Sequence, residues 1–437
     1  MKKSFPAWIF LLAAALAAVV SSCQMPRPSA PPTFQPPAHP VLLDGVLGGA
    51  PYRVRVPSNW NGTLLLYAHG YQKRARHSGE TEMRDPADAP GPLESPVLPD
   101  MEPVLLERGF GLAGSAFRAN GWDVREAIED MLALREFFIQ QVGRPKRTIL
   151  WGLSLGAMIA ARSIEETPRV YDGAICGCMP GAGATRSWDK VLDLSLAYDA
   201  ALGWPKSWGT VRLVAPDVDY GKDVAPEIGR QLKEKDWLAR FEFVRASLGA
   251  GPEDFYKVPA GSPALLALMF FATEARAELQ TRAGGPVGEN LGRRYQPSAE
   301  VWTYLGSLGA KSEWLDWMNA RADMAPDEKV RAYLARNADF SGRVQVPVLS
   351  IHTTVDGLVS PAHDSAYRET LKSAGRDALL VQAFTNGVGH CLFTEAQFLD
   401  AVVAMESWLE SGTPPASDAF PAGDGFVPGF RPPPWQP

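Results

Sequence analysis

The sequence predicts an α/β fold that carries a large helical insertion, and three observations lead to this prediction. Short apolar runs typical of strands alternate with segments of helical periodicity along the 437 residues. A Gly-x-Ser-x-Gly turn, Gly152–Gly156, stands between one such strand and a helix. About 200 residues then separate Ser154 from Asp356, a candidate functional residue in the loop after a later strand. This separation is longer than the usual connection between two strands of a compact domain.

The strands are expected in order along the chain. Val41–Leu47 and Tyr52–Val56 have the pattern of an antiparallel pair, joined by Gly48 and Gly49. The later strands are apolar runs and are expected at Gly62–Ala68, Phe110–Ser115, Thr148–Trp151, Val170–Met179, Val346–His352 and Ala378–Phe384.

Helices are expected between these strands. One covers Met101–Arg108, after a polar loop at Gln72–Asp100. A second begins at a capping box, Asp123–Glu126, and runs to about Gln141 with apolar residues at helical spacing. A third, Ala157–Arg162, directly follows the serine turn.

The serine turn is typical of a nucleophile elbow. Strand Thr148–Trp151 leads into it, so Ser154 stands at the apex of a strand–turn–helix unit. Glycines at positions 152 and 156 leave out side chains that would collide where the helix meets the strand. The helix N-terminus and the N–H of Leu155 then point to the place where an oxyanion forms. The plain alternative is an ordinary Gly-Ser turn.

Three further segments support the elbow interpretation. His69-Gly70-Tyr71 follows a buried strand, where a backbone N–H, assigned to Tyr71, can be a second oxyanion donor. Asp356 precedes a glycine after the strand Val346–His352, and His390 lies in a glycine loop after the last strand. Taken singly, each has a plain alternative as a turn or loop residue. The order Ser154, Asp356, His390 is nevertheless the order of one class of serine hydrolases.

With these motifs the chain resembles the α/β-hydrolase superfamily of serine esterases, lipases and peptidases. The resemblance covers residues 41–182 and 341–411. It implies a mostly parallel eight-stranded sheet with helices on both faces. It also implies that Ser154 is the nucleophile, His390 the general acid and base, and Asp356 the orienting carboxylate, while Leu155 and Tyr71 supply the oxyanion hole. No cofactor is implied, and the superfamily hosts many chemistries, so the substrate stays open.

The surplus between the core segments, residues 183–340, is expected to be a helical cap. Its helices are predicted at Glu227–Leu248, Pro263–Gln280, Pro297–Leu305, Ser312–Arg321 and Asp327–Arg336. Seven of the 13 tryptophans fall in it: Trp188, Trp204, Trp208, Trp237, Trp302, Trp314 and Trp317. We expect most of them to pack the cap core, and a few to line a slot over Ser154. Residues 412–437 form a Pro- and Gly-rich tail that is expected to be irregular.

The N-terminus is typical of an exported protein. Residues 1–23 combine a basic start, an apolar stretch too short to span a membrane, and Val20-Ser21-Ser22-Cys23. That tetrapeptide resembles a bacterial lipobox, so Cys23 is the predicted lipidation site of a lipoprotein anchored in the cell envelope, at the outer membrane or cell surface. A Pro-rich tether follows at residues 24–40. The alternative is an ordinary secretory signal and a secreted protein.

Composition and spacing exclude several other functions. A net charge of −6 without a Lys/Arg run argues against nucleic acid as a partner. The six histidines are scattered, and neither CxxC nor HExxH occurs, so no metal is expected. Cys391 beside His390 resembles tannase- and feruloyl-esterase-like hydrolases, which brace this loop with a disulfide. Those enzymes place the partner cysteine next to the serine, where this chain has Gly152-Leu153. The partner would therefore have to be Cys176 or Cys178, and buried free thiols are the alternative.

The sequence therefore favours an enzyme that hydrolyses small or polymeric carboxylic esters through an acyl-enzyme. Two alternatives stay open. One is a serine exopeptidase of the prolyl-oligopeptidase-like type, for which an acidic cluster that binds a substrate α-amine would be the sign. The other is a non-catalytic surface lipoprotein on a hydrolase scaffold, against which the complete set of Ser154, Asp356 and His390 speaks.

Overall fold

A computed structural model describes residues 34–73, 101–249 and 263–436 of the chain. The predicted signal peptide, Cys23, the first part of the tether and most of the Gln72–Asp100 loop lie outside these residues. The fold described below is that of the compact unit Pro36–Pro437. Among the described residues, no helix has the length and apolar character that crossing a membrane requires.

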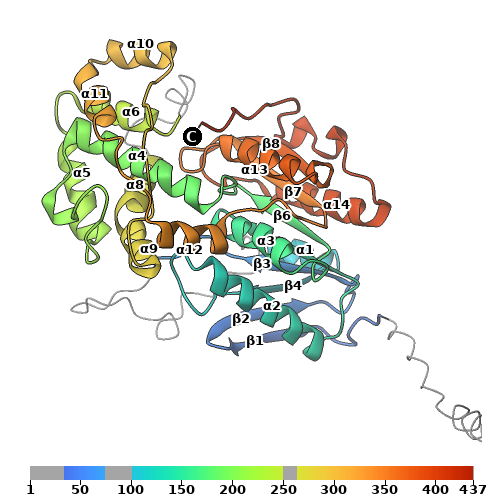
Figure 1. Cartoon of the computed structure of the whole chain (residues 1–437). Helices are drawn as coiled ribbons and strands as arrows, with labels where there is room; N and C mark the ends of the chain where they lie inside the picture. The colour runs from blue at the N-terminus through green and yellow to red at the C-terminus, as the bar shows by residue number, and fades with distance from the viewer. Residues whose placement is uncertain (1–33, 74–100, 250–262, 437) are drawn as a thin grey trace, which may run out of the picture. The chain divides into compact units, whose positions relative to one another are not determined.

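An eight-stranded sheet forms the centre of the fold (Figure 1). Its strands lie in the order β1-β2-β4-β3-β5-β6-β7-β8. The bounds are β1 Val41–Leu47, β2 Ala50–Val56, β3 Thr63–Ala68, β4 Gly111–Ser115, β5 Arg147–Leu153, β6 Gly173–Gly177, β7 Val348–Val355 and β8 Leu380–Val388. Strand β2 runs antiparallel to both β1 and β4, and all other neighbours are parallel.

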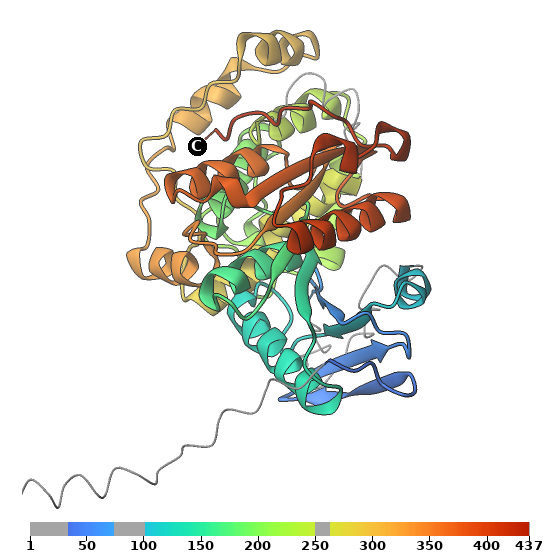
Figure 2. The same ribbon diagram turned by 90° about the vertical axis from the view of Figure 1, so that its right-hand side faces the viewer.

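Helices cover both faces of the sheet, as Figure 2 shows. On one face, α1 (Met101–Glu107) and α14 (Glu395–Ser411) pack on alternate residues of the strands, among them Leu65, Tyr67 and Trp151. On the other face lie α2 (Val124–Gln141) and α3 (Leu155–Glu166). Burial on both faces explains why β3 and β4 are apolar or small throughout. The predicted α/β-hydrolase fold is confirmed.

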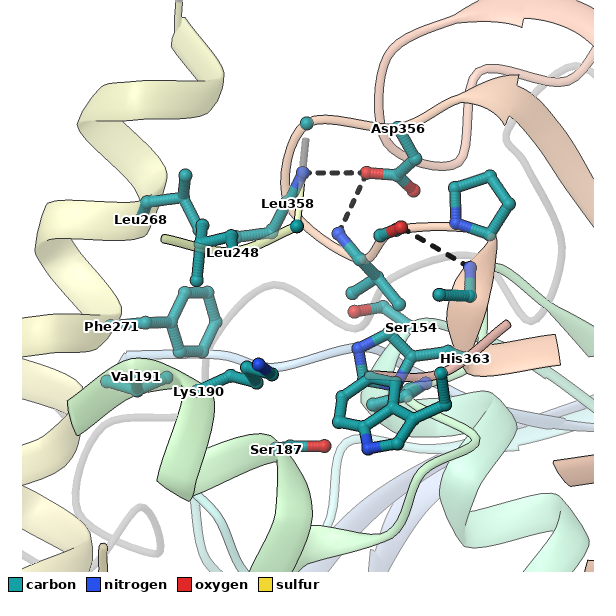
Figure 3. Close-up of a pocket in the computed structure, with 18 of the residues that line it drawn as sticks. Ser154, Ser187, Lys190, Val191, Leu248, Leu268, Phe271, Asp356, Leu358 and His363 are labelled. Atoms are coloured by element: carbon teal, nitrogen blue, oxygen red, sulfur yellow. Dashed lines mark hydrogen bonds between the residues drawn. The ribbon is translucent and has the colours of Figure 1, made fainter. Parts of the chain in front are cut away.

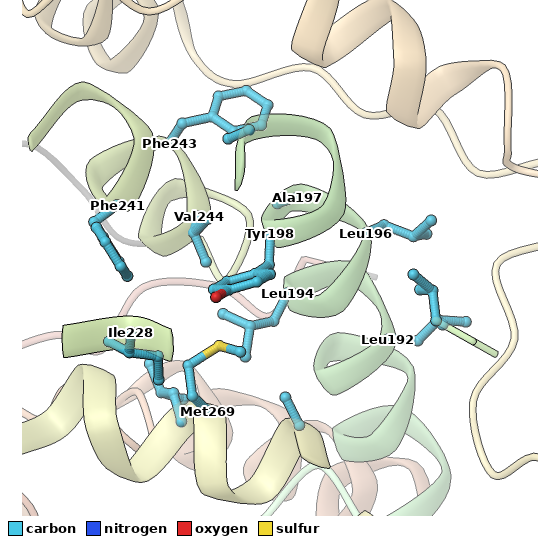
Figure 4. Close-up of a cluster of buried hydrophobic side chains, with 14 of the residues drawn as sticks. Leu192, Leu194, Leu196, Ala197, Tyr198, Ile228, Phe241, Phe243, Val244 and Met269 are labelled. Atoms are coloured by element: carbon cyan, nitrogen blue, oxygen red, sulfur yellow. The ribbon is translucent and has the colours of Figure 1, made fainter. Parts of the chain in front are cut away.

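The insertion is helical and has a hydrophobic core of its own (Figure 4). Its helices are α4 Ala184–Leu202, α5 Ala225–Gln231, α6 Trp237–Ala246, α8 Pro263–Phe270, α9 Arg276–Ala283, α10 Ala299–Ser307, α11 Ser312–Asn319 and α12 Glu328–Ala338. Tyr198, Phe241 and Met269 bring three of these helices together in that core. Trp208 and Trp314 belong to it, and Trp204, Trp237, Trp302 and Trp317 pack against it, while Trp188 lies elsewhere.

Two local predictions are wrong. The single helix predicted at Glu227–Leu248 is two helices, α5 and α6, because a charged turn at residues 233–236 redirects the chain and lets Ile228 and Phe241 both reach the cap core. The capping box at Asp123 does not form. Its backbone (φ −103°, ψ 43°) is not extended and its side chain makes no hydrogen bond to the helix, while Glu126 lies 3.8 Å from Arg282 of α9.

The tail after α14 is largely irregular, as predicted, but it is anchored. Two short 3₁₀ turns, Ser417–Ala419 and Ala422–Asp424, lead to Phe426, which bridges Thr385 at the free edge of β8. The N–H of Val427 donates to the carbonyl of Phe384 at 2.7 Å. Beyond this anchor, residues 431–436 continue toward the candidate active site.

Candidate active site

Ser154 occupies a strained turn between β5 and α3. Its backbone has φ 56° and ψ −122°, a region that residues with side chains rarely adopt. The N–H of Ser154 donates to the carbonyl of Gly177 on β6 at 2.8 Å. A Cβ atom on Gly156 would lie 2.0 Å from the Ala68 carbonyl oxygen, and one on Gly152 would lie 2.4 Å from the Gly156 carbonyl carbon. Both glycines are therefore needed for the helix to approach the sheet this closely.

The two candidate oxyanion donors stand beside this serine. Helix α3 begins at Leu155, so the N–H of Leu155 lies in the first turn, where no carbonyl of the same helix can accept it. Gly70 lies two residues after the end of β3, and a Cβ on Gly70 would lie 3.7 Å from the Ser154 Cβ. Tyr71 follows and lines the same pocket as Ser154, with its ring against Phe271 at a centroid distance of 5.2 Å. The role of the Tyr71 N–H as an oxyanion donor stays a prediction.

Asp356 and His390 come together from the ends of β7 and β8. Nδ1 of His390 donates to Oδ2 of Asp356 at 2.7 Å. The other carboxylate oxygen of Asp356 accepts the N–H groups of Leu358 at 2.8 Å and Val359 at 2.9 Å. The loop after β7 thus fixes the carboxylate, and the carboxylate fixes the imidazole with Nε2 turned away from it.

The electrostatics of this pair suit a histidine that accepts a proton. Burial opposes the charged form of each group, but their mutual attraction is stronger. The pKa of Asp356 accordingly lies well below its ordinary value, with His352 contributing as well. Asp356 raises the pKa of His390 to about 9. The carboxylate thus stays ionised over the whole neutral range.

Ser154 and His390 line one pocket together with Tyr71 and Cys391. Among the described residues no hydrogen bond joins the Ser154 hydroxyl to His390, whose Nε2 lies 3.5 Å from Sγ of Cys391. Catalytic hydrogen bonds of this kind are often long before substrate binds. The structure therefore brings all three predicted triad residues to one site.

A second buried imidazole, which the sequence analysis did not identify, contacts the same carboxylate. Nε2 of His352 lies 3.4 Å from Oδ2 of Asp356, and its Nδ1 lies 2.5 Å from Oδ2 of Asp364. The Ser350 hydroxyl donates to the other oxygen of Asp364 at 2.6 Å. The available sequence signal was the pair of polar residues, Ser350 and His352, inside an otherwise apolar strand.

The cysteines lie against the histidine loop. The N–H of Cys391 donates to Sγ of Cys178 at 3.2 Å, and both residues have a positive φ. Cys176, Cys178 and Cys391 are free thiols in this structure. The pairing of Cys391 with Cys176 or Cys178 stays a prediction, and the contact makes Cys178 the nearer partner.

Two groups of three side chains have donor atoms within 4.8 Å of one another and so have the spacing of a metal site. They are Cys178, His390 and Cys391, and Cys178, His352 and Asp356. Each group shares a member of the candidate triad, and burial raises the pKa of Cys178 well above its ordinary value.

A second pocket at Ser154 lies between the sheet and the insertion (Figure 3). Helix α4 supplies Ser187, Lys190 and Val191 to its wall, while Leu268 and Phe271 come from the α8 region. The loop after β7 supplies Leu358 and His363. Residues 433–436 of the tail complete the wall, a role that the sequence did not indicate.

A model of a tannase-like family of unknown function matches residues 41–212. An o-phthalyl amidase from Xanthobacter agilis is 21% identical over 425 residues, which cover 85% of this chain and 87% of the amidase.

Solved structures of similar architecture include feruloyl esterase B from Aspergillus oryzae, with 15% identity and a TM-score of 0.42 over 86% of this chain and 82% of the esterase. They also include the rice cell wall degrading esterase LipA from Xanthomonas oryzae (14% identity, TM-score 0.37, 82% of this chain and 84% of that one). A proline iminopeptidase from Mycobacterium smegmatis has 14% identity and a TM-score of 0.39, over 85% of this chain and 98% of the peptidase.

Proposed function

We propose that this α/β-hydrolase is a serine hydrolase that cleaves carboxylic esters through an acyl-enzyme. The observation that carries the proposal is the strained Ser154 turn, which shares a pocket with a histidine held at 2.7 Å by Asp356. Residues are held in such backbone conformations mainly at functional sites. The tannase-like family match supports an ester substrate.

In the proposed mechanism, neutral His390 removes the proton from Ser154 as the hydroxyl attacks the substrate carbonyl. Asp356 keeps the imidazole in the correct tautomer and stabilises its charged form. The N–H groups of Leu155 and Tyr71 bind the oxyanion, and each contributes about 3 kcal/mol of transition-state stabilisation in comparable sites. His390 then protonates the leaving group, and water attacks the acyl-enzyme by the same route in reverse.

The charges of the pocket speak against an aminopeptidase. An exopeptidase of that kind needs carboxylates that bind the substrate α-amine. Among the described residues that line the pocket between the sheet and the insertion, Asp356 is the only carboxylate, and it is the candidate triad carboxylate. Amide hydrolysis as such remains a second candidate, because the curated relative is an amidase.

Residues of the insertion and of the C-terminal tail enclose the pocket at Ser154. This enclosure supports a preference for small or medium-sized soluble esters over long-chain lipids. Helices α4 and α8 and residues 433–436 surround the approach to Ser154.

We further propose that the chain is exported and anchored to the bacterial envelope through a lipid on Cys23, on the strength of the Val20–Cys23 motif and the Pro-rich segment after it. Intact-mass measurement of the membrane-extracted protein would detect a diacylglyceryl chain that starts at Cys23, and a soluble form that starts elsewhere would refute the anchor.

A substrate panel tests the activity. We would compare nitrophenyl esters of increasing acyl length, matched nitroanilides and aminoacyl anilides, with Ser154→Ala as the blank. Ester turnover that depends on Ser154 and exceeds anilide turnover supports the proposal. Faster turnover of simple anilides would favour an amidase, faster turnover of aminoacyl anilides would favour a peptidase, and no turnover above the blank would favour a non-catalytic role.

A further inference from the structure

The end of the chain forms a thin part of the wall around the pocket between the sheet and the insertion. Residues 433–436 line this pocket together with Ser154. Pro433, Pro434 and Gln436 are also exposed to solvent, and Trp435 is half-buried. A residue that lines a pocket with one side and faces solvent with another is a wall one residue thick. The tail therefore separates this part of the pocket from the solvent.

Trp435 docks the tail onto both the hydrolase core and the insertion. Its ring centroid lies 4.7 Å from that of His363, in the first turn of α13 (Ala362–Ser373). Cζ of Arg186 lies 5.9 Å and Nζ of Lys190 lies 6.0 Å from the same indole, and both residues belong to α4. At these distances a cation is attracted to the face of an indole. In Figure 3, His363 lies across the pocket from Leu268 and Phe271 of the insertion, so the tail docks on the side away from α8.

Two contacts before Trp435 fix the path of the tail. The ring of Phe430 packs on that of Phe384 in β8, with the centroids 4.9 Å apart. The Ser365 hydroxyl of α13 donates to the carbonyl of Pro432 at 3.2 Å. Prolines occupy positions 432, 433 and 434, and their fixed φ angles stiffen the backbone between these contacts and the indole. The wall is therefore held in one place before substrate arrives.

We propose that Trp435 and the prolines before it are specificity-determining residues, which set the upper size limit of the substrate by closing one end of the pocket. The other walls belong to packed parts of the fold, whereas among the described residues none after Phe426 belongs to the cap core or to the apolar layer under α14. The tail can therefore be shortened without opening either core. This inference rests on the proposed function. It makes the preferred substrates esters whose acyl or alcohol group ends at the indole, and it predicts that longer groups fit once the indole is removed.

The test uses two ester series that probe the size limit from either side of the scissile bond. 4-Nitrophenyl esters from acetate to decanoate lengthen the acyl group, while the acetates of phenol, 4-butylphenol and 4-octylphenol lengthen the leaving group. All are used below their solubility limits. The readout is the ratio of kcat/KM for the longest and the shortest member of each series, which cancels differences in active fraction between variants.

In at least one series, Trp435→Ala should raise this ratio by about tenfold or more, because a closed pocket discriminates by about that factor or more for a single methylene group. A chain that ends at Phe430 keeps the β8 anchor and should raise the ratio at least as much. Trp435→Phe keeps an aromatic wall and should leave the ratio within about threefold of the wild-type value.

Trp317→Ala is the matched control. Trp317 is also a half-buried tryptophan with a cation over its ring, since Cζ of Arg321 lies 3.5 Å from the ring centroid. It belongs to α11, however, and lines neither of the two pockets at Ser154. The ratio should therefore be unchanged in this variant.

Ratios that stay unchanged or fall in both series, in Trp435→Ala and in the shortened chain, both folded by circular dichroism, would overturn the size limit. A fall would mean that the indole binds the substrate instead of excluding its longer forms. Such results would leave the proposed function standing as long as the acetate esters are cleaved in a manner that requires Ser154. Absence of turnover throughout both series would instead refute the proposed function.

Discussion

His352 holds its Nε2 atom 3.4 Å from Oδ2 of Asp356, the same carboxylate oxygen that accepts the hydrogen bond of the candidate catalytic imidazole. Nε2 of His352 also lies 2.9 Å from the Val359 carbonyl oxygen, and Nδ1 faces the carboxylate of Asp364. All these neighbours are acceptors when the carboxyl groups are ionised, so both ring nitrogens can donate only if the imidazole is charged. The site thus holds a second, buried cation against the acidic member of the triad.

Replacing His352 by Asn should move the acid limb of the kcat/KM profile to higher pH. The imidazolium of His352 shares Asp356 with His390 and disfavours a second positive charge there, so its loss raises the pKa of His390. We also expect kcat to fall about tenfold, since Asp356 loses one charge-assisted contact worth ~1.4 kcal/mol. The pH profile on a neutral nitrophenyl ester measures both effects. An acid limb that stays in place, or moves to lower pH, would contradict a charged His352.

Asp356→Asn should shift the same limb in the opposite direction. Without the carboxylate, burial alone acts on His390 and lowers its pKa. The asparagine also favours the wrong tautomer of the imidazole, so kcat should fall by about four orders of magnitude. Circular dichroism provides the control for folding. A variant with near-normal turnover would mean that Asp356 is not what orients the base.

The wild-type enzyme should be most active in alkaline solution. His390 must be neutral to accept the serine proton, and its pKa is raised to about 9. Its neutral fraction, and with it kcat/KM for a neutral ester, should therefore rise as the pH increases from 7 to 9 and level off above that value. Initial rates corrected with Ser154→Ala, which removes spontaneous hydrolysis, give the profile. A plateau that is already complete at pH 7 would contradict the raised pKa.

Much of this site could be predicted from the sequence because each candidate catalytic residue lies in a short motif directly after a strand. Gly152–Gly156 follows a buried strand directly, and Asp356 and His390 each follow another. In a parallel sheet the carboxyl ends of strands lie at one edge, so the chain order of the motifs indicates their meeting place. The resemblance implied a mostly parallel eight-stranded sheet, and the structure has such a sheet.

What the sequence did not indicate depends on distant parts of the chain. Lys190 lies on α4, and nothing in its local pattern shows that Trp435, in a proline-rich tail, packs beside it. In the sequence, His352 is a polar residue in a largely apolar strand. Only the structure shows that Asp364 and Asp356 lie beside its imidazole. The Asp123 capping box failed for a similar reason, because Glu126 has a tertiary partner in Arg282 that the local motif cannot reveal.

Ser154→Ala should abolish labelling by a fluorophosphonate probe, which reacts with an activated serine and needs no knowledge of the substrate. Ser187 lines the same pocket, but its hydroxyl donates to the Gly183 carbonyl at 2.6 Å within α4, so Ser187→Ala should label like the wild type. In-gel fluorescence at equal protein concentration measures both variants. Undiminished labelling of Ser154→Ala would refute the assignment of the nucleophile.

Gly156→Ala should damage both stability and activity, although the substitution adds a single methyl group. The new Cβ would lie 2.0 Å from the Ala68 carbonyl oxygen and 2.7 Å from that of His69, and neither backbone atom can rotate away. Helix α3 and strand β3 would have to separate, which displaces Ser154 from the Gly70–Tyr71 backbone. We expect the free energy of unfolding to fall by about 3 kcal/mol, at the upper end of the usual cost of overpacking.

Gly306→Ala is the matched control for this substitution. Gly306 lies in the exposed part of α10, where an added Cβ meets no atom within 4 Å. Because Gly306 is the next-to-last residue of α10, an alanine there should stabilise the protein by less than the roughly 1 kcal/mol of a helix interior, and activity should not change. Chemical denaturation followed by circular dichroism measures both variants. If Gly156→Ala unfolded at the wild-type midpoint and kept full ester turnover, the close contact of helix and sheet would not be what positions the nucleophile.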